Sequence, residues 1–117
     1  MPDNKLYDLK KLHEMLGDDA EEVKNLLNVF VSTTPISLQS MNEGYEEDDA
    51  KKIATFAHKM KASLGILDID SLYDTVRKID KQDKVEDIDQ GELDTIIATM
   101  NQVINDVIDQ LKDEYQL

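Results

Sequence analysis

Apolar residues recur at steps of three and four along most of this chain, which is the spacing of one face of an α-helix. The pattern predicts helices over residues 6–16, 19–45, 49–67 and 93–111. A further long helical segment is expected after Asp68 or Asp70, with Leu72, Val76 and Ile79 on one face. The polar stretch over residues 81–90 predicts a loop. Since no stretch shows the alternation of a β-strand, the expected fold class is all-α.

Residues that start, bend and stop helices support these boundaries. Gly17 ends the first helix, and Asp18-Asp19 offers a capping side chain for the second. Pro35 is expected to bend the second helix, because the apolar period resumes beyond it. Short connections between these helices predict a single domain over residues 1–117 that forms an antiparallel up-down four-helix bundle with a short extra N-terminal helix.

Composition narrows the classes of function. A net charge of −13 opposes binding to nucleic acid and to anionic membrane surfaces, both of which need clustered Lys and Arg. No apolar run is long enough to span a membrane, and the polar N-terminus lacks the apolar stretch of a signal peptide. With no Cys there is neither a disulfide framework nor a thiolate metal site. We expect a cytoplasmic monomer, and the initial Met favours a free-standing protein over a domain excised from a kinase.

The segment from Ala54 to Leu67 carries the candidate chemistry. On a helical wheel of about 100° per residue, His58 falls roughly 140° from Ile53, which lies on the apolar, core-facing side. The residues nearest to His58 on this wheel are Lys61 and four small or short ones, Ala54, Thr55, Ala62 and Gly65. An imidazole on such a smooth surface suits a nucleophile that a partner must reach, and we expect the four short residues to form the docking surface.

The charge around His58 differs from that of the rest of the chain. No Asp or Glu occurs over residues 50–67, although 26 of the 117 residues are acidic. The same window contains four lysines, Lys51, Lys52, Lys59 and Lys61. Positive charge beside an acceptor stabilises a phosphoryl group during transfer, because that group is polyanionic. Lys61, three residues after His58, can reach such a group, whereas Lys59 points about 100° away.

The residues around His58 resemble those of the histidine-containing phosphotransfer (HPt) family. The family pattern is a His, a Lys three residues later, a small pair and Leu-Gly, which here are His58, Lys61, Ala62-Ser63 and Leu64-Gly65. The residue after the Lys is usually Gly in the family and is Ala62 in this chain, which is still small. The likeness extends more loosely over residues 19–45 and 72–80.

The resemblance implies a phosphorelay intermediate. His58 would accept a phosphoryl group, through Nε2, from the aspartyl phosphate of one receiver domain and pass it to another, with Lys61 stabilising the phosphate. The implied partners are response-regulator receiver domains and a hybrid histidine kinase. The chain itself would bind no cofactor and no metal, because the receiver domain supplies Mg²⁺. Without a Gly-rich phosphate loop it would be a phosphocarrier and not a kinase.

Two other functions compete with this interpretation. The same helix face could dock a receiver or kinase domain without chemistry, as an inhibitor or scaffold. A helical bundle could also hold a ligand or metal in its core, but the inward positions here are Leu, Ile, Val and Met. The roles of the small residues are also open, since Ala54, Ala62 and Gly65 could serve close helix packing instead of docking.

Overall fold

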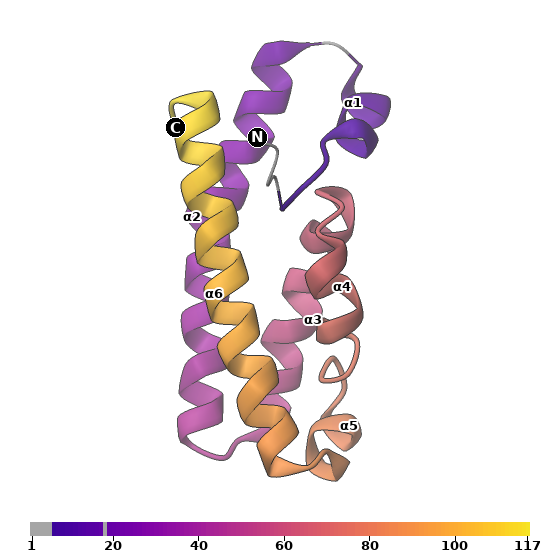
Figure 1. The fold of residues 1–117 in the computed structure, drawn as a ribbon, viewed down its shortest axis with the longest axis vertical. Helices are drawn as coiled ribbons and strands as arrows, with labels where there is room; N and C mark the ends of the chain where they lie inside the picture. Colours follow the sequence, from indigo (N-terminus) through magenta and orange to yellow (C-terminus); the bar gives the residue numbers. More distant parts are fainter. Residues whose placement is uncertain (1–5, 18) are drawn as a thin grey trace.

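The described part of the chain folds into helices joined by short turns and loops. The computed structural model describes residues 6–17 and 19–117, without the side chains of residues 70 and 71. Within these residues it contains no strand and has six helices (Figure 1), namely α1 (Lys10–Leu16), α2 (Ala20–Glu46), α3 (Ala50–Ile66), α4 (Asp70–Val76), α5 (Gln82–Asp87) and α6 (Gln90–Tyr115). The predicted all-α class is confirmed.

Four of these helices form an antiparallel bundle. The α2 helix packs against both α3 and α6, and the short α4 helix packs against α3 and α6 on the other side. Successive helices of the bundle run in opposite directions along its long axis (Figure 1). The α1 helix contacts α2, and α5 contacts α3. The predicted four-helix bundle with an extra N-terminal helix is therefore confirmed.

One aliphatic cluster holds the helices together. Every helix contributes at least one buried side chain to it, and even the short helices α1 and α5 do so, through Leu12 and Val85. The expected inward face of α3 is buried as predicted, at Ile53, Ala57, Met60 and Leu64. The burial of apolar surface is the main favourable term in folding, so this cluster fixes the face that α3 presents to solvent.

Aspartate side chains cap the three long helices. Asp19 accepts hydrogen bonds from the backbone N–H groups of Glu21 and Glu22 at 3.0 and 3.2 Å. Asp49 accepts one from the Lys52 N–H at 3.0 Å at the start of α3, and Asp89 accepts one from the Glu92 N–H at 3.3 Å at the start of α6. Each bond satisfies a donor that has no partner inside its helix. The part of the predicted Asp18-Asp19 cap that falls on Asp19 is confirmed, and Asp18 lies outside the described residues.

Several boundaries differ from the prediction. The first helix begins at Lys10, and the segment after α3 is a helix of only seven residues that starts after Ile69, which makes no side-chain cap. Residues 81–90 are not all loop, because α5 occupies Gln82–Asp87. Val85, the one apolar residue of that helix, is buried, and α5 packs on α3. Tertiary contact thus stabilises a helix too short to form alone. Pro35 lies within α2, which stays one helix.

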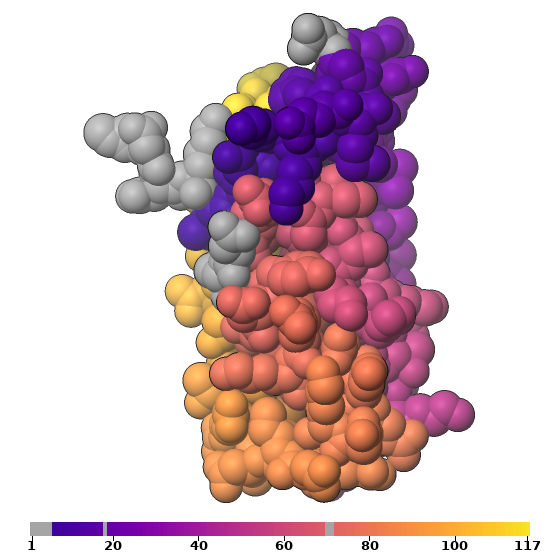
Figure 2. Space-filling view, turned by 90° about the vertical axis from the view of Figure 1, so that its right-hand side faces the viewer, coloured from indigo at the N-terminus to yellow at the C-terminus, as the bar shows by residue number. Residues whose placement is uncertain are grey.

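The segment before α1 crosses one end of the bundle. The Asp8 N–H donates to the Leu67 carbonyl at 2.8 Å, and Lys11 Nζ lies 3.4 Å from Asp68 Oδ1. The Tyr7 hydroxyl donates to the Glu114 carboxylate of α6. Figure 2 shows α1, in indigo, lying over the ends of the helices that follow it. The N-terminal segment is thereby attached both to the end of α3 and to α6.

Candidate functional site

The α3 helix is set against α2 by a close turn. A Cβ atom at Gly44 would lie 3.0 Å from Lys52 Cβ and 3.1 Å from the Ile53 nitrogen, closer than side chains normally approach. The Gly44 carbonyl also accepts a hydrogen bond from the Asp49 N–H at 2.8 Å. The absence of a side chain at Gly44 therefore lets the two helices meet closely and fixes the rotation of α3.

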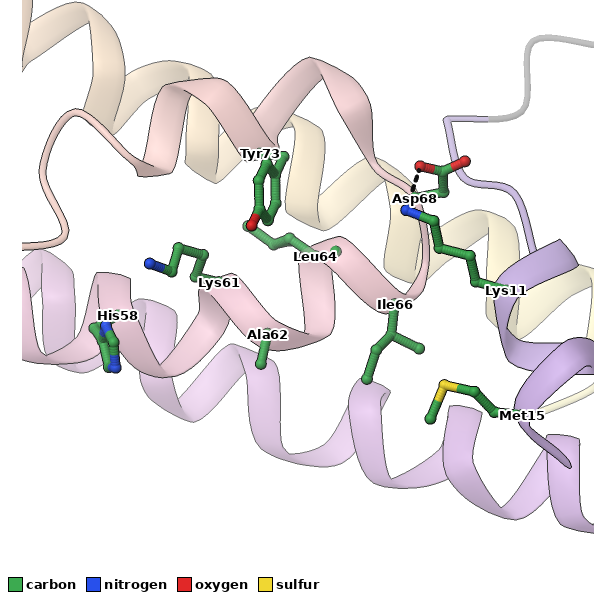
Figure 3. Close-up of a pocket in the computed structure, with 10 residues that line it drawn as sticks. Lys11, Met15, His58, Lys61, Ala62, Leu64, Ile66, Asp68 and Tyr73 are labelled. Atoms are coloured by element: carbon green, nitrogen blue, oxygen red, sulfur yellow. Dashed lines mark hydrogen bonds and ion pairs between the residues drawn. The ribbon is translucent and has the colours of Figure 1, made fainter.

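His58 lies on the exposed side of α3, as predicted. Its side chain is exposed, and it makes no hydrogen bond or ion pair with any residue that the structure describes. The ring lines one end of an open groove of about 470 Å³ (Figure 3). The ring is therefore open to solvent, and no described residue occupies either nitrogen, which leaves the imidazole free to act as a nucleophile.

The groove continues from His58 along α3 to α1. Its walls come from α3, from the segment that follows it and from α1, and its lining includes Ala62, Gly65, Ile66, Tyr73, Lys11 and Met15. Met15 is 63% exposed, so its thioether side chain is open to solvent. Lys11 and Met15 were missed by sequence reasoning, because the approach of α1 to the end of α3 depends on the tertiary contacts of residues 7–11.

Lys61 makes an ion pair that the sequence did not indicate. Its Nζ lies 2.8 Å from Oδ2 of Asp80, whose side chain is 4% exposed. Lys84 Nζ lies 3.1 Å from the other carboxylate oxygen, Oδ1. In Figure 3 the Lys61 side chain and the His58 ring leave α3 on different sides. The lysine that the pattern assigns to phosphate stabilisation is thus held by a buried carboxylate in this structure.

The two lysines determine the charge of Asp80. Burial by itself raises the pKa of this carboxyl group, but hydrogen bonds and positive charge from Lys61 and Lys84 outweigh burial and hold its pKa below the ordinary value. Asp80 was not among the predicted site residues. The spacing of Asp80 and Lys84, four residues apart, suits an ion pair on a helix or turn, but the same spacing recurs elsewhere in this charged chain.

The four predicted docking residues divide into two groups. Thr55 and Ala62 are exposed, as expected, and the Thr55 hydroxyl donates to the Lys51 carbonyl at 2.8 Å. Ala54 is only 5% exposed and belongs to the core, so the prediction that it lies on the accessible face was wrong. Gly65 is half-buried, and a Cβ atom there would lie 3.2 Å from the Tyr73 ring. Tyr73 of α4 covers Gly65, and Ala54 belongs to the core that α3 shares with the helices packed against it.

The other lysines near His58 have separate contacts. Lys52 lies 3.4 Å from Glu43 and 3.5 Å from Glu47, at the end of α2. Lys59 Nζ lies 4.9 Å from the centroid of the Phe56 ring, a cation–π distance. Lys51 and Lys59 remain exposed. Of the four lysines expected to make this region positive, Lys52 and Lys61 are therefore paired with carboxylates, and Lys51 and Lys59 stay exposed.

The described residues include no group of three or more His, Asp or Glu side chains placed to hold a metal ion. None of the helices in this part of the chain is long and apolar enough to cross a membrane. The chemistry that this site offers is that of one accessible imidazole, with a lysine one turn further along the helix.

Comparisons with known proteins identify the family but no individual relative. No curated protein and no solved structure matches the chain. The family model described as the Hpt domain matches residues 25–114, and this match includes α3, α4, α5 and nearly all of the rest of the bundle. With most of its length matched in this way, the chain belongs to the Hpt domain family.

Proposed function

We propose that His58 is the phosphoacceptor of this protein and that the protein carries a phosphoryl group between receiver domains of a phosphorelay. Hpt domains are phosphocarrier modules of two-component signalling, and they interact with receiver domains and kinases. The observation that carries the assignment to His58 is its accessibility, since the ring is exposed, makes no hydrogen bond to a described residue, and lies in an open groove. The only other histidine, His13 of α1, is also exposed, but a lysine three residues later, followed by two small residues, accompanies His58 alone.

The proposed step is a displacement at phosphorus. The unprotonated ring nitrogen of neutral His58, taken as Nε2, attacks the phosphorus of an aspartyl phosphate, so that an N–P bond forms and the P–O bond to the aspartyl oxygen breaks. The carboxylate leaves with the bonding electron pair, and the other ring nitrogen loses its proton to water. Passing the phosphoryl group to a second receiver domain reverses these changes.

The groove residues would serve this step by admitting and stabilising the partner's phosphoryl group. Thr55 and Ala62 are exposed and short, so a receiver domain can approach the ring closely. Lys61 would contribute positive charge to the transferred group after it moves away from Asp80. Mg²⁺ would come with the receiver domain, and the chain would act as a monomer in the cytoplasm without a cofactor of its own.

The test is transfer from a phosphorylated receiver domain. Wild-type protein, mixed with Mg²⁺ and a receiver domain carrying a labelled aspartyl phosphate, should acquire label on His58. His58→Gln should lose at least about 100-fold in labelling, since glutamine is no nucleophile, while His13→Gln should retain it. Lys61→Ala should fold normally and transfer more slowly, by about ten-fold.

Two results would count against the proposal. Label on the His58→Gln variant equal to that of wild type would remove His58 from the chemistry. Unlabelled wild-type protein that nevertheless binds the receiver domain would favour the alternative, a docking or inhibitor module without phosphotransfer.

A further inference from the structure

A buried carboxylate shared by two lysines lies beside the helix that carries His58. Asp80 is 4% exposed, and each of its oxygens faces one ammonium group, Lys61 at 2.8 Å and Lys84 at 3.1 Å. A carboxylate removed from water in this way needs a cationic partner, because a buried unpaired charge is strongly destabilising. Asp80 has two such partners, so it keeps a cationic neighbour when one of them moves away.

The two lysines differ in how firmly they are held. Lys84 follows Asp80 by four residues and also donates to the Arg77 carbonyl at 2.8 Å, so it has a second bond within the same segment. Lys61 comes from a different helix, and among the described residues its one polar side-chain contact is with Asp80. Lys84 can therefore stay with Asp80 while Lys61 turns into solvent.

A phosphoryl group on His58 would attract Lys61. The two residues are three positions apart on α3, so the flexible Lys61 side chain, which here points to Asp80, can turn toward the ring. A phosphoryl group bound to nitrogen carries about two negative charges. The ammonium group of Lys61 would then have a choice between that group and Asp80. Whatever stabilisation it gives to the phosphoryl group is reduced by the loss of its contact with Asp80.

We propose that Asp80 is a positioning residue that competes with the phosphoryl group on His58 for Lys61, and so limits how strongly this protein retains that group. Lys84 makes the exchange possible, because it remains paired with Asp80 when Lys61 leaves. A carrier that passes its phosphoryl group on must not bind it too tightly, and this competition weakens the retention. The inference rests on the proposed role of His58.

The test uses a phosphoryl donor that needs no partner protein. Phosphoramidate transfers its phosphoryl group to imidazole: the N–P bond of the donor breaks, a bond from phosphorus to His58 forms, and ammonia leaves and takes up the ring proton. At fixed concentrations of phosphoramidate and ammonium, ³¹P nuclear magnetic resonance gives the ratio of phosphorylated to free His58. Because this ratio is an equilibrium quantity, changes in receiver docking do not affect it.

The competition predicts effects of opposite sign. Asp80→Asn should raise the ratio by about five-fold, the change expected for an ion pair with a partly exposed partner. Lys84→Met should lower it, since Lys61 then becomes the sole cationic partner of Asp80. Lys61→Ala should also lower it, and adding Asp80→Asn to that variant should change it no more than Asp74→Asn does. Asp74 is an exposed residue of α4 and serves as the charge-matched control.

The outcomes separate this inference from the proposed function. If wild-type His58 takes up no phosphoryl group, both fail. If it does, and folded Asp80→Asn gives an unchanged or lower ratio, the inference alone is wrong. If Asp80→Asn raises the ratio equally in wild type and in the Lys61→Ala variant, the inference is also wrong. The Asp80 carboxylate would then act on the phosphoryl group only through its long-range electrostatic field. A lowered ratio in Lys84→Met supports the competition even if Asp80→Asn proves too unstable to measure.

Discussion

The two flanks of α3 beside His58 both contain small residues, but one flank is exposed to solvent and the other is covered by neighbouring parts of the protein. We define the open flank as Thr55 and Ala62, and the closed flank as Ala54, Lys61 and Gly65. On a helical wheel both lie within about 60° of His58, on opposite sides of it.

On the open flank both residues are exposed. On the closed flank Ala54 is buried, Lys61 pairs with the buried Asp80, and Gly65 faces the Tyr73 ring. His58 thus lies at the border between solvent and protein. A partner can reach the ring along the groove, which Ala62 of the open flank and Gly65 of the closed flank both line, while the contacts of the closed flank determine where the nearest lysine is held.

Enlarging an alanine on each flank gives the largest expected contrast. Ala54→Leu adds volume inside a packed core and should lower the free energy of unfolding by about 1–3 kcal/mol. Ala62→Leu places the same side chain in solvent and should change it by less than about 0.5 kcal/mol. Urea denaturation monitored by circular dichroism measures both. Equal losses in the two variants would show that the flanks do not differ in burial.

The pH dependence of stability in an Asp80→Asn variant tests the ion pair of the closed flank. Folding lowers the pKa of this carboxyl group below its ordinary 3.8, so its ionised form contributes stability above that pH, and the contribution is lost as the pH falls through the lower folded value. Asp80→Asn should therefore be less stable than wild type at pH 7, by about 1 kcal/mol, since both lysine partners are partly exposed.

The difference between wild type and Asp80→Asn should disappear in acid. Thermal unfolding at pH 7, 4 and 2.5 measures it, with Asp74→Asn as the exposed control. A gap that does not narrow at all as the pH falls would contradict the assigned cause, because protonation of the wild-type carboxylate removes its charge and with it the ion pairs.

A methyl group at Gly65 gives the smallest expected effect. Alanine is preferred over glycine inside a helix by up to about 1 kcal/mol, but its Cβ would lie 3.2 Å from Tyr73 Cε1. Tyr73 is half-buried and lines the open groove, so we expect the ring to shift and Gly65→Ala to stabilise the protein by about 0.5 kcal/mol. Destabilisation that Tyr73→Leu relieves would instead show that the ring is rigidly held.

The periodicity of α3 was enough to predict the position of His58. Ile53, Ala57, Met60 and Leu64 share one face, and any fold that buries this face turns the imidazole away from the core. The aspartate cap and the length of α2 could also be predicted from the sequence, because both depend on residues that are neighbours along the chain. The helix within residues 81–90 could not be predicted in this way, because α5 is stabilised by the burial of Val85 against another helix.

By itself, the sequence determined an all-helical bundle, the face that α3 buries and the exposure of His58, because helical periodicity and capping are local properties of the chain. Only the tertiary structure decided which flank of α3 stays open. Ala54 became buried, Asp80 became the partner of Lys61, and Lys11 and Met15 came to line the groove. The physical reason is that each of these outcomes depends on which helices pack beside α3. Contacts between residues distant in sequence produce no periodic pattern from which they could be predicted.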